Sequence, residues 1–282
     1  MFCRAAAAAL AVAFVLFVLV VALAAAVLCE GGGLGPIRGG ATAGGARRRE
    51  GARARPYRQF PAGVRLAARA HPEWGAVDYD LFEVAPGDVS AYSSMMPWHA
   101  PDLGKALRAE LPDPPRTITD ATAHVGGDSA FFLKVFPSAA VTAVEVRPAV
   151  AAVLRRNARR ITRALSLPPS RLRVVVADAR DFLARGGGVS ELVFFDPPWA
   201  GSRGVPLLGD TPLAGHVAAA LRSGARAVLV KLPREVDLDA FEAEVGLEAT
   251  RHPIRDARVN KSGKLSYWLL AFREGRARAL GE

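Results

Sequence analysis

The chain alternates short apolar runs with amphipathic segments beyond residue 57, and this pattern limits the possible folds most strongly. Runs of β-type composition predict strands at 117–121, 141–146, 172–176, 191–195 and 227–231. Segments of helical periodicity predict helices at 100–111, 129–136, 148–163, 212–223 and 239–245. Strands that alternate with helices favour a mostly parallel sheet covered on both faces, a Rossmann-like α/β fold.

The last two apolar runs are not separated by a helical segment. Residues 248–253 and 265–272 predict two antiparallel strands around a polar turn at 260–264. We therefore expect an antiparallel hairpin at one edge of the sheet. The predicted catalytic domain spans residues 116–276, and residues 57–115 form an extension that contains a helix.

Residues 5–28 contain no charged or polar side chain. Because about 20 apolar residues cross a bilayer, residues 1–29 predict a transmembrane anchor or a signal segment, with the membrane as a partner if the segment is uncleaved. The arginines that follow, Arg38 and Arg47 to Arg49, favour a domain in the cytosol. Alternatively, residues 31–70, with Glu50 as their only acid, resemble a plastid transit peptide behind a signal.

Composition limits the remaining possibilities. Residues 30–56 are rich in Gly and Arg and predict a disordered linker. The formal net charge of +10 favours an anionic partner such as a nucleic acid or a membrane surface. The only cysteines are Cys3 and Cys29, so the rest of the chain has no thiolate nucleophile and no cysteine-ligated zinc. We expect a monomer.

Acidic residues stand at or near the ends of four predicted strands: Asp120, Glu145, Asp178 and Asp196. Ligands of open α/β sheets bind at these carboxyl ends. Gly126 and Gly127 would let the backbone approach a ligand closely. We expect Glu145 to accept ribose hydroxyls and Asp178 to accept from an adenine amine, which is the order that an adenosyl ligand requires.

The tetrapeptide Asp196-Pro197-Pro198-Trp199 follows the fourth strand. An exocyclic base amine is a poor nucleophile, so its N–H groups need fixed acceptors, which the Asp196 carboxylate and the Pro197 carbonyl can supply. Neither proline has an N–H to compete, and both stiffen the loop. Trp199 offers a face for a base, and such stacking is worth about 1–3 kcal/mol. We predict these four residues as catalytic.

The same residues have structural alternatives. A glycine pair or an Asp-Pro-Pro turn also occurs without a ligand. Glu145 could pair with Arg147 at the surface. Trp98 and Trp268 favour the core.

The runs DATAHVGGDSAFFLKVF (120–136), TAVEVRP (142–148), VADARDF (176–182), VFFDPPWAGSRG (193–204) and VLVKLPREVDLDAF (228–241) together resemble one family. It is the trimethylguanosine synthase family of RNA cap guanine-N2 methyltransferases, including its forms in large DNA viruses. The resemblance covers about residues 90–275. Two departures stand out, because His124 replaces a glycine of many members and Ala200 replaces the first glycine after the tryptophan.

The resemblance implies a class I methyltransferase that uses S-adenosyl-L-methionine, without a metal, to methylate guanine N2 of RNA, with the 7-methylguanosine cap as target. The methyl donor would contact Asp120, Gly126, Gly127, Glu145, Asp178 and Asp196. Trp199 would stack the guanine, Asp196 would hold its amine, and Lys231 or Arg234 would contact cap phosphates.

Two further functions remain open. The first is an amino-methyltransferase for guanine N2 or adenine N6 of ribosomal or transfer RNA. The second is a membrane-tethered RNA-binding module without activity.

Overall fold

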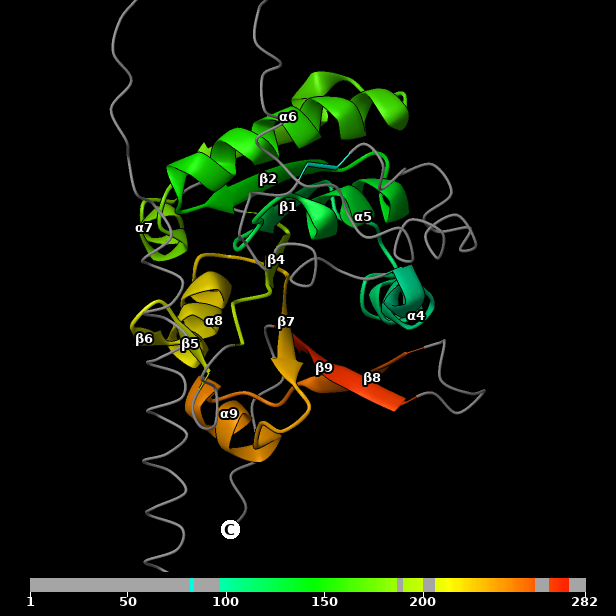
Figure 1. Ribbon diagram of the computed structural model, residues 1–282. Coiled ribbons are helices and arrows are strands. Elements are labelled where there is room, and N and C mark those ends of the chain that lie inside the picture. The colour runs from blue at the N-terminus through cyan, green and yellow to red at the C-terminus, as the bar shows by residue number, and fades with distance from the viewer. Residues whose placement is uncertain (1–81, 84–96, 187–189, 200–205, 257–263, 274–282) are drawn as a thin grey trace, which may run out of the picture. The chain divides into compact units, whose positions relative to one another are not determined.

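The computed structural model describes residues 82–83, 97–186, 190–199, 206–256 and 264–273 (Figure 1). The predictions for the apolar segment 5–28, the linker 30–56, most of the extension 57–115, Ala200 and most of the turn 260–264 lie outside these residues. Within the described part of the chain, no helix is both long and apolar enough to cross a membrane.

Seven strands form one sheet, in the order β3-β2-β1-β4-β7-β9-β8. Five of them are parallel: β1 (Thr117–Asp120), β2 (Ala140–Glu145), β3 (Leu172–Val176), β4 (Leu192–Phe195) and β7 (Ala227–Pro233). The last two, β8 (Thr250–Asp256) and β9 (Lys264–Arg273), form an antiparallel pair, and β9 is also antiparallel to β7. The predicted mostly parallel, Rossmann-like sheet with an antiparallel hairpin is confirmed.

Helices cover both faces of the sheet (Figure 1). One core cluster contains buried residues of α4 (Ala100–Glu110), α5 (Gly127–Val135) and α6 (Pro148–Ala164). The other contains residues of α7 (Ala179–Ala184), α8 (Leu213–Arg222) and α9 (Leu238–Val245). Two short 3-10 turns, η3 (Pro97–His99) and η4 (Pro169–Arg171), precede α4 and β3. The apolar periodicity of the sequence therefore places the two helix layers.

The helix α6 shows how the sequence fixes this packing. Pro148 lies in its first turn, where the missing N–H is not needed. Its buried residues Val150, Val153, Leu154 and Ile161 recur at helical spacing and form one face. The opposite face carries arginines.

Several element boundaries differ from the prediction. The helix α5 begins at Gly127 rather than at residue 129, after Gly126 takes a φ of +96°. The strand β8 covers Thr250–Asp256 rather than 248–253. A short hairpin that was not predicted, β5 (Leu207–Leu208) with β6 (Thr211–Pro212), turns at Gly209, whose φ is +65°. Glycine is the residue that adopts such angles without steric cost.

Candidate active site

The strand order changes direction between β1 and β4, and the loop after β1 is bonded both to β4 and to the loop that follows β4. The Ala121 N–H donates to the Phe194 carbonyl at 2.9 Å. The Asp196 N–H donates to Thr122 Oγ1 at 2.7 Å. The fold therefore brings the region after Asp120 against the Asp196-Pro197-Pro198-Trp199 loop at the switch point, where α/β proteins bind ligands.

The loop after β1 is shaped by two residues with positive φ. A side chain at Gly126 would put its Cβ 2.7 Å from Leu154 Cδ1 of α6, so it would displace the end of that side chain as well as strain a backbone with a φ of +96°. His124 has a φ of +49°, in the region that favours glycine. The position of His124, where many members of the family that the sequence resembles have glycine, thus has a backbone conformation that favours glycine.

Asn157 of α6 fixes the same loop. Its side chain is fully buried, and its Nδ2 donates to the carbonyls of Val125 and Glu83, each at 2.9 Å. Its Oδ1 accepts from the Glu83 N–H at 2.9 Å. One carboxamide therefore joins α6, the loop after β1 and the segment 82–83.

Glu145 lies at the end of β2 and is 7% exposed. Its Oε2 accepts from the His124 N–H at 3.1 Å, so the carboxylate faces the loop after β1. Its Oε1 accepts from the Arg147 N–H at 3.0 Å and from Arg147 Nε at 3.1 Å. The pairing with Arg147 exists, but it involves a buried carboxylate rather than a surface one. Each carboxylate oxygen can accept two hydrogen bonds, which leaves capacity for a ligand hydroxyl.

Asp178 has a structural role that was not predicted. Its Oδ1 accepts from the Arg180 N–H at 2.8 Å and so caps the N-terminus of α7. Its side chain is 40% exposed, so it remains accessible. Contact with an adenine stays a prediction.

Lys231 of β7 connects two carboxylates inside the protein. Its Nζ donates to Asp128 Oδ1 at 2.6 Å and to Asp196 Oδ2 at 2.9 Å, and its side chain is only 2% exposed. The Phe194 ring centroid lies 5.3 Å from the ammonium and the Tyr267 centroid 5.5 Å from it. We call Asp128, Asp196 and Lys231 the lysine cluster.

These positions bear on the two predicted phosphate contacts. The Lys231 ammonium lies inside the protein between two carboxylates, and its contact with a phosphate stays a prediction. Arg234 is 45% exposed, and its Nε donates to Glu235 Oε1 at 2.5 Å.

Burial changes the protonation of the acids around the lysine cluster. Burial raises the pKa of Asp196 to about 7, although the Lys231 ammonium opposes the shift. Burial and the neighbouring Asp128 raise the pKa of Asp120 to about 8. Burial alone would lower the pKa of Lys231, but Asp128 and Asp196 hold it well above its usual range. The site therefore keeps one lysine cationic while the pKa values of Asp120 and Asp196 lie near neutrality.

Asp120 retains an open acceptor. Its Oδ2 accepts from Ser129 Oγ at 2.6 Å, whereas its buried Oδ1 has no hydrogen-bond partner among the described residues. Buried polar atoms are rarely left in this state. This oxygen is therefore a candidate contact for a bound molecule.

Trp199 is the large aromatic side chain of the loop after β4, and it is 37% exposed. The Tyr267 ring of β9 lies beside it, with 5.7 Å between centroids and an interplanar angle of 56°. One part of the indole is thus supported by Tyr267 while another part is open to solvent. Within the described ranges, no group of three or more His, Cys, Asp or Glu side chains is arranged to hold a metal ion.

No protein-family model and no curated protein matches the chain. Solved structures with a similar fold include a proposed RNA methyltransferase from Pyrococcus horikoshii, with 17% identity, a TM-score of 0.45 and coverage of 64% of this chain and 84% of that one. A SAM-dependent methyltransferase from Agrobacterium tumefaciens shares 17% identity at a TM-score of 0.46, over 64% of this chain and 63% of that one. A SAM-dependent methyltransferase from Neisseria gonorrhoeae shares 21% identity at a TM-score of 0.43, over 79% and 97%. A likeness at these identities concerns the fold alone.

Proposed function

We propose that this chain is an S-adenosyl-L-methionine-dependent methyltransferase that acts on an exocyclic amine of a nucleobase, with guanine N2 of RNA as its target. The observation that carries the proposal is the placement of the Asp196-Pro197-Pro198-Trp199 loop. It follows the central strand β4 at the switch point of the sheet, bonded to the loop after β1 and close to a buried acid with an open acceptor oxygen.

The residues at the strand ends suit the methyl donor. Asp120 Oδ1 is a buried acceptor without a partner among the described residues, and Glu145 is a buried carboxylate with remaining acceptor capacity at the end of β2. Gly126 and Gly127 lie between these two acids in the sequence, where α5 begins, and Asp178 lies at the start of α7. These residues would hold the donor, which supplies a sulfonium-bound methyl group that is electrophilic without help from a metal.

The protein's own residues orient the accepting amine. Asp196 presents a carboxylate whose Oδ2 is fixed by Lys231 at 2.9 Å, and the Pro197 carbonyl adds a second acceptor. Neither Pro197 nor Pro198 offers an N–H that would compete. Trp199, supported by Tyr267, would stack on the base.

Asp196 also has a proton-transfer role. When the amine nitrogen takes the methyl group, the carbon–sulfur bond of the donor breaks, the thioether S-adenosylhomocysteine is left, and the nitrogen must give up one proton. The Asp196 carboxylate, with a pKa of about 7, is poised to accept that proton near neutral pH and to release it to water afterwards.

For the substrate itself, we propose the 7-methylguanosine cap of RNA. The resemblance of residues 90–275 to cap guanine-N2 methyltransferases supports this choice, and in particular the run 228–241 beyond the tetrapeptide. Guanine N2 or adenine N6 of ribosomal or transfer RNA is the nearest alternative target. The enzymes that methylate these amines and the cap enzymes all use an acidic or amide residue followed by two prolines and an aromatic side chain.

Transfer of tritium from S-adenosyl-[methyl-³H]methionine by the full-length chain tests the proposal. We expect label in capped RNA and much less in uncapped RNA or DNA. Trp199→Ala should mainly raise KM for the RNA, because stacking on an aromatic ring is worth about 1–3 kcal/mol per base. Label in uncapped ribosomal or transfer RNA would contradict the cap as substrate and support the alternative substrates. Failure to bind the methyl donor in calorimetry would contradict the enzyme and favour an inactive RNA-binding module.

We further propose that residues 5–28 anchor the chain in a membrane with the catalytic domain in the cytosol. The length of this apolar run and the arginines after it support the proposal. A fluorescent protein fused to the C-terminus should colocalise with a membrane marker and remain accessible from the cytosol. Fluorescence inside plastids would contradict it.

A further inference from the structure

The segment between Glu145 and Asp178 is acid-free and rich in arginine. Residues 146–177 contain no Asp, Glu or Lys but hold eight arginines: Arg147, Arg155, Arg156, Arg159, Arg160, Arg163, Arg171 and Arg173. This segment forms α6, η4 and β3, so the charge is concentrated on one helix and the adjoining edge strand of the sheet. Such a local excess of one sign is an electrostatic footprint for an anionic partner.

The fold uses some of these arginines internally. Arg156 Nε donates to Glu83 Oε2 at 2.8 Å, Arg160 pairs with the same carboxylate, and Arg147 pairs with Glu145. By contrast, Arg155, Arg159, Arg163 and Arg173 are exposed, and no carboxylate in the described part of the chain pairs with them. We call these four residues the arginine surface.

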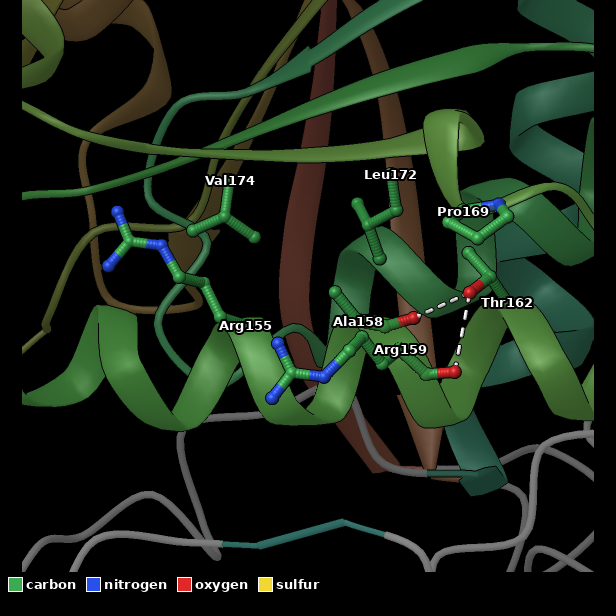
Figure 2. Close-up of a pocket in the computed structure, with 7 residues that line it drawn as sticks. All are labelled: Arg155, Ala158, Arg159, Thr162, Pro169, Leu172 and Val174. Atoms are coloured by element: carbon green, nitrogen blue, oxygen red, sulfur yellow. Dashed lines mark hydrogen bonds between the residues drawn. The ribbon is translucent and has the colours of Figure 1, made fainter.

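Two residues of the arginine surface, Arg155 and Arg159, line a depression of about 190 Å³ between α6 and β3. Figure 2 shows Arg155 and Arg159 on neighbouring turns of α6, beside Val174 and Leu172 of β3. Pro169 closes one end, and the Thr162 hydroxyl donates back to the Ala158 carbonyl at 3.0 Å. The polar groups that remain for a ligand are therefore guanidinium groups at the rim of an apolar floor.

The geometry of α6 relates this surface to the active site. The helix starts at Pro148, three residues after Glu145. With a rise of 1.5 Å per residue, Arg155 lies about 10 Å along the axis from Pro148, and Arg163 lies about 22 Å along it. Arg155, Arg159 and Arg163 recur every four residues, so they share one side of the helix. The row leads away from Glu145 over a length that suits several nucleotides.

We propose that the arginine surface binds the phosphate backbone of the RNA substrate at nucleotides beyond the methylated base. This rests on the proposed function only for the identity of the substrate. Guanidinium groups match phosphate oxygens in paired geometry, and their binding releases counterions. The contacts read no base, so they give affinity and orientation rather than sequence preference.

A double variant, Arg155→Gln with Arg159→Gln, tests the proposal in the full-length chain. Its matched control is Arg108→Gln with Arg222→Gln, which removes two exposed arginines of α4 and α8. Fluorescence anisotropy with a labelled RNA measures binding as a function of salt. We expect the test variant to lose about tenfold in affinity, and its slope of log K against log salt to fall by about 1.4, since each lost contact to a single strand is worth about 0.7. The control should keep both values.

Methyl transfer separates this proposal from the proposed function. The test variant should lose activity on a long capped RNA while keeping the activity of the unchanged protein on a cap dinucleotide, which is too short to reach the arginine surface. If neither the test variant nor the unchanged protein transfers methyl groups but their difference in RNA affinity persists, the arginine surface is supported and the proposed reaction is contradicted. Equal RNA binding and equal salt slopes in the two variants would overturn the proposal. Loss of binding to phosphatidylserine vesicles without loss of RNA binding would also overturn it, in favour of a membrane partner.

Discussion

The two sides of the switch point hold their acids in different ways. On the side of β2 and β3, the acids accept mainly from backbone N–H groups. Glu145 accepts from those of His124 and Arg147, and Asp178 accepts from that of Arg180. On the side of β4 and β7, Asp196 is bonded to the Lys231 ammonium, 35 residues away. The first side therefore relies on backbone donors, and the second on a buried ion network that joins α5, the loop after β4 and β7.

Substitutions on the two sides should therefore have effects of different size. An acid whose partners are mainly backbone N–H groups can be exchanged with less effect elsewhere, because those groups stay in place. A buried charge that loses its counter-charge is left uncompensated, which is among the most destabilising changes in a protein. Substitutions at four positions test this contrast, and their expected effects decrease in the order Lys231, Asp196, Glu145 and Asp178.

Replacing Lys231 by Met should have the largest effect. It leaves Asp128 and Asp196 buried without their cation, and breaking a buried pair in this way costs about 3–5 kcal/mol. Urea denaturation at pH 8 measures the loss in the free energy of unfolding. Lys264→Met, at an exposed position of β9, is the control. Adding Asp128→Asn to Lys231→Met should restore part of the stability. An equal loss in Lys231→Met and Lys264→Met would show that the buried ion network adds nothing to the free energy of unfolding.

Asp196→Asn should lower kcat by roughly a hundredfold to a thousandfold, the usual effect of removing one positioned polar group. In the unchanged protein, kcat/KM should rise about tenfold per pH unit up to about pH 7 and then level off, because the carboxylate with a pKa of about 7 must be ionised. Stability should show the opposite trend. A raised pKa favours the folded state at low pH, and this contribution is lost as the pH rises from about 3.8 to about 7.

The pH profile and a stability series measured on the same preparation check both trends. Asp196→Asn should remove the part of the pH dependence of stability that comes from this group. Activity that is independent of pH between about 5 and 8 would contradict a proton-accepting Asp196.

Glu145→Gln should weaken the binding of S-adenosyl-L-methionine by roughly tenfold to a hundredfold, since a hydrogen bond to a charged group contributes about 1.5–3 kcal/mol. Isothermal titration measures the dissociation constant. Glu244→Gln, on the exposed surface of α9, should bind the donor normally. Unchanged affinity in Glu145→Gln would remove this acid from the donor site.

Asp178→Ala should have the smallest effect on the fold, a loss of about 1 kcal/mol from the missing N-cap of α7. Asp237→Ala removes the equivalent cap of α9, where Asp237 Oδ1 accepts from the Ala240 N–H at 3.0 Å. The two variants should unfold at similar urea concentrations. Asp178→Ser keeps a cap but removes the carboxylate, so weaker donor binding in that variant alone would assign Asp178 to the ligand rather than to the helix.

The sequence predicted the parts of this molecule that depend on local pattern. Apolar periodicity located the parallel strands and five of the helices but missed the short α7, and the final hairpin followed from two apolar runs without a helix between them. The acids at the strand ends could be placed because parallel strands present their carboxyl ends on one side. The start of α5 was missed by two residues, since only the φ of Gly126 shows where the loop stops.

The lysine cluster could not be predicted in the same way. Asp128 and Lys231 are 103 residues apart, and nothing near either residue encodes the other. One signal was present: Lys231 interrupts the otherwise apolar run AVLVKLP, and a lysine inside a buried strand is almost always paired. Asn157 is likewise a polar residue on the otherwise mainly apolar buried face of α6, which it shares with Thr162.

The bonding of Asn157 constrains how this protein can change over time. Its amide group serves two chain segments and a helix at once, and no other side chain of similar size offers both a donor pair and an acceptor in that arrangement. A substitution there disturbs the loop after β1 and residues 82–83 together, so a compensating change at one of them does not restore the other. Sequence changes in the loop after β1 are therefore expected at neighbours such as His124, while position 157 stays as it is.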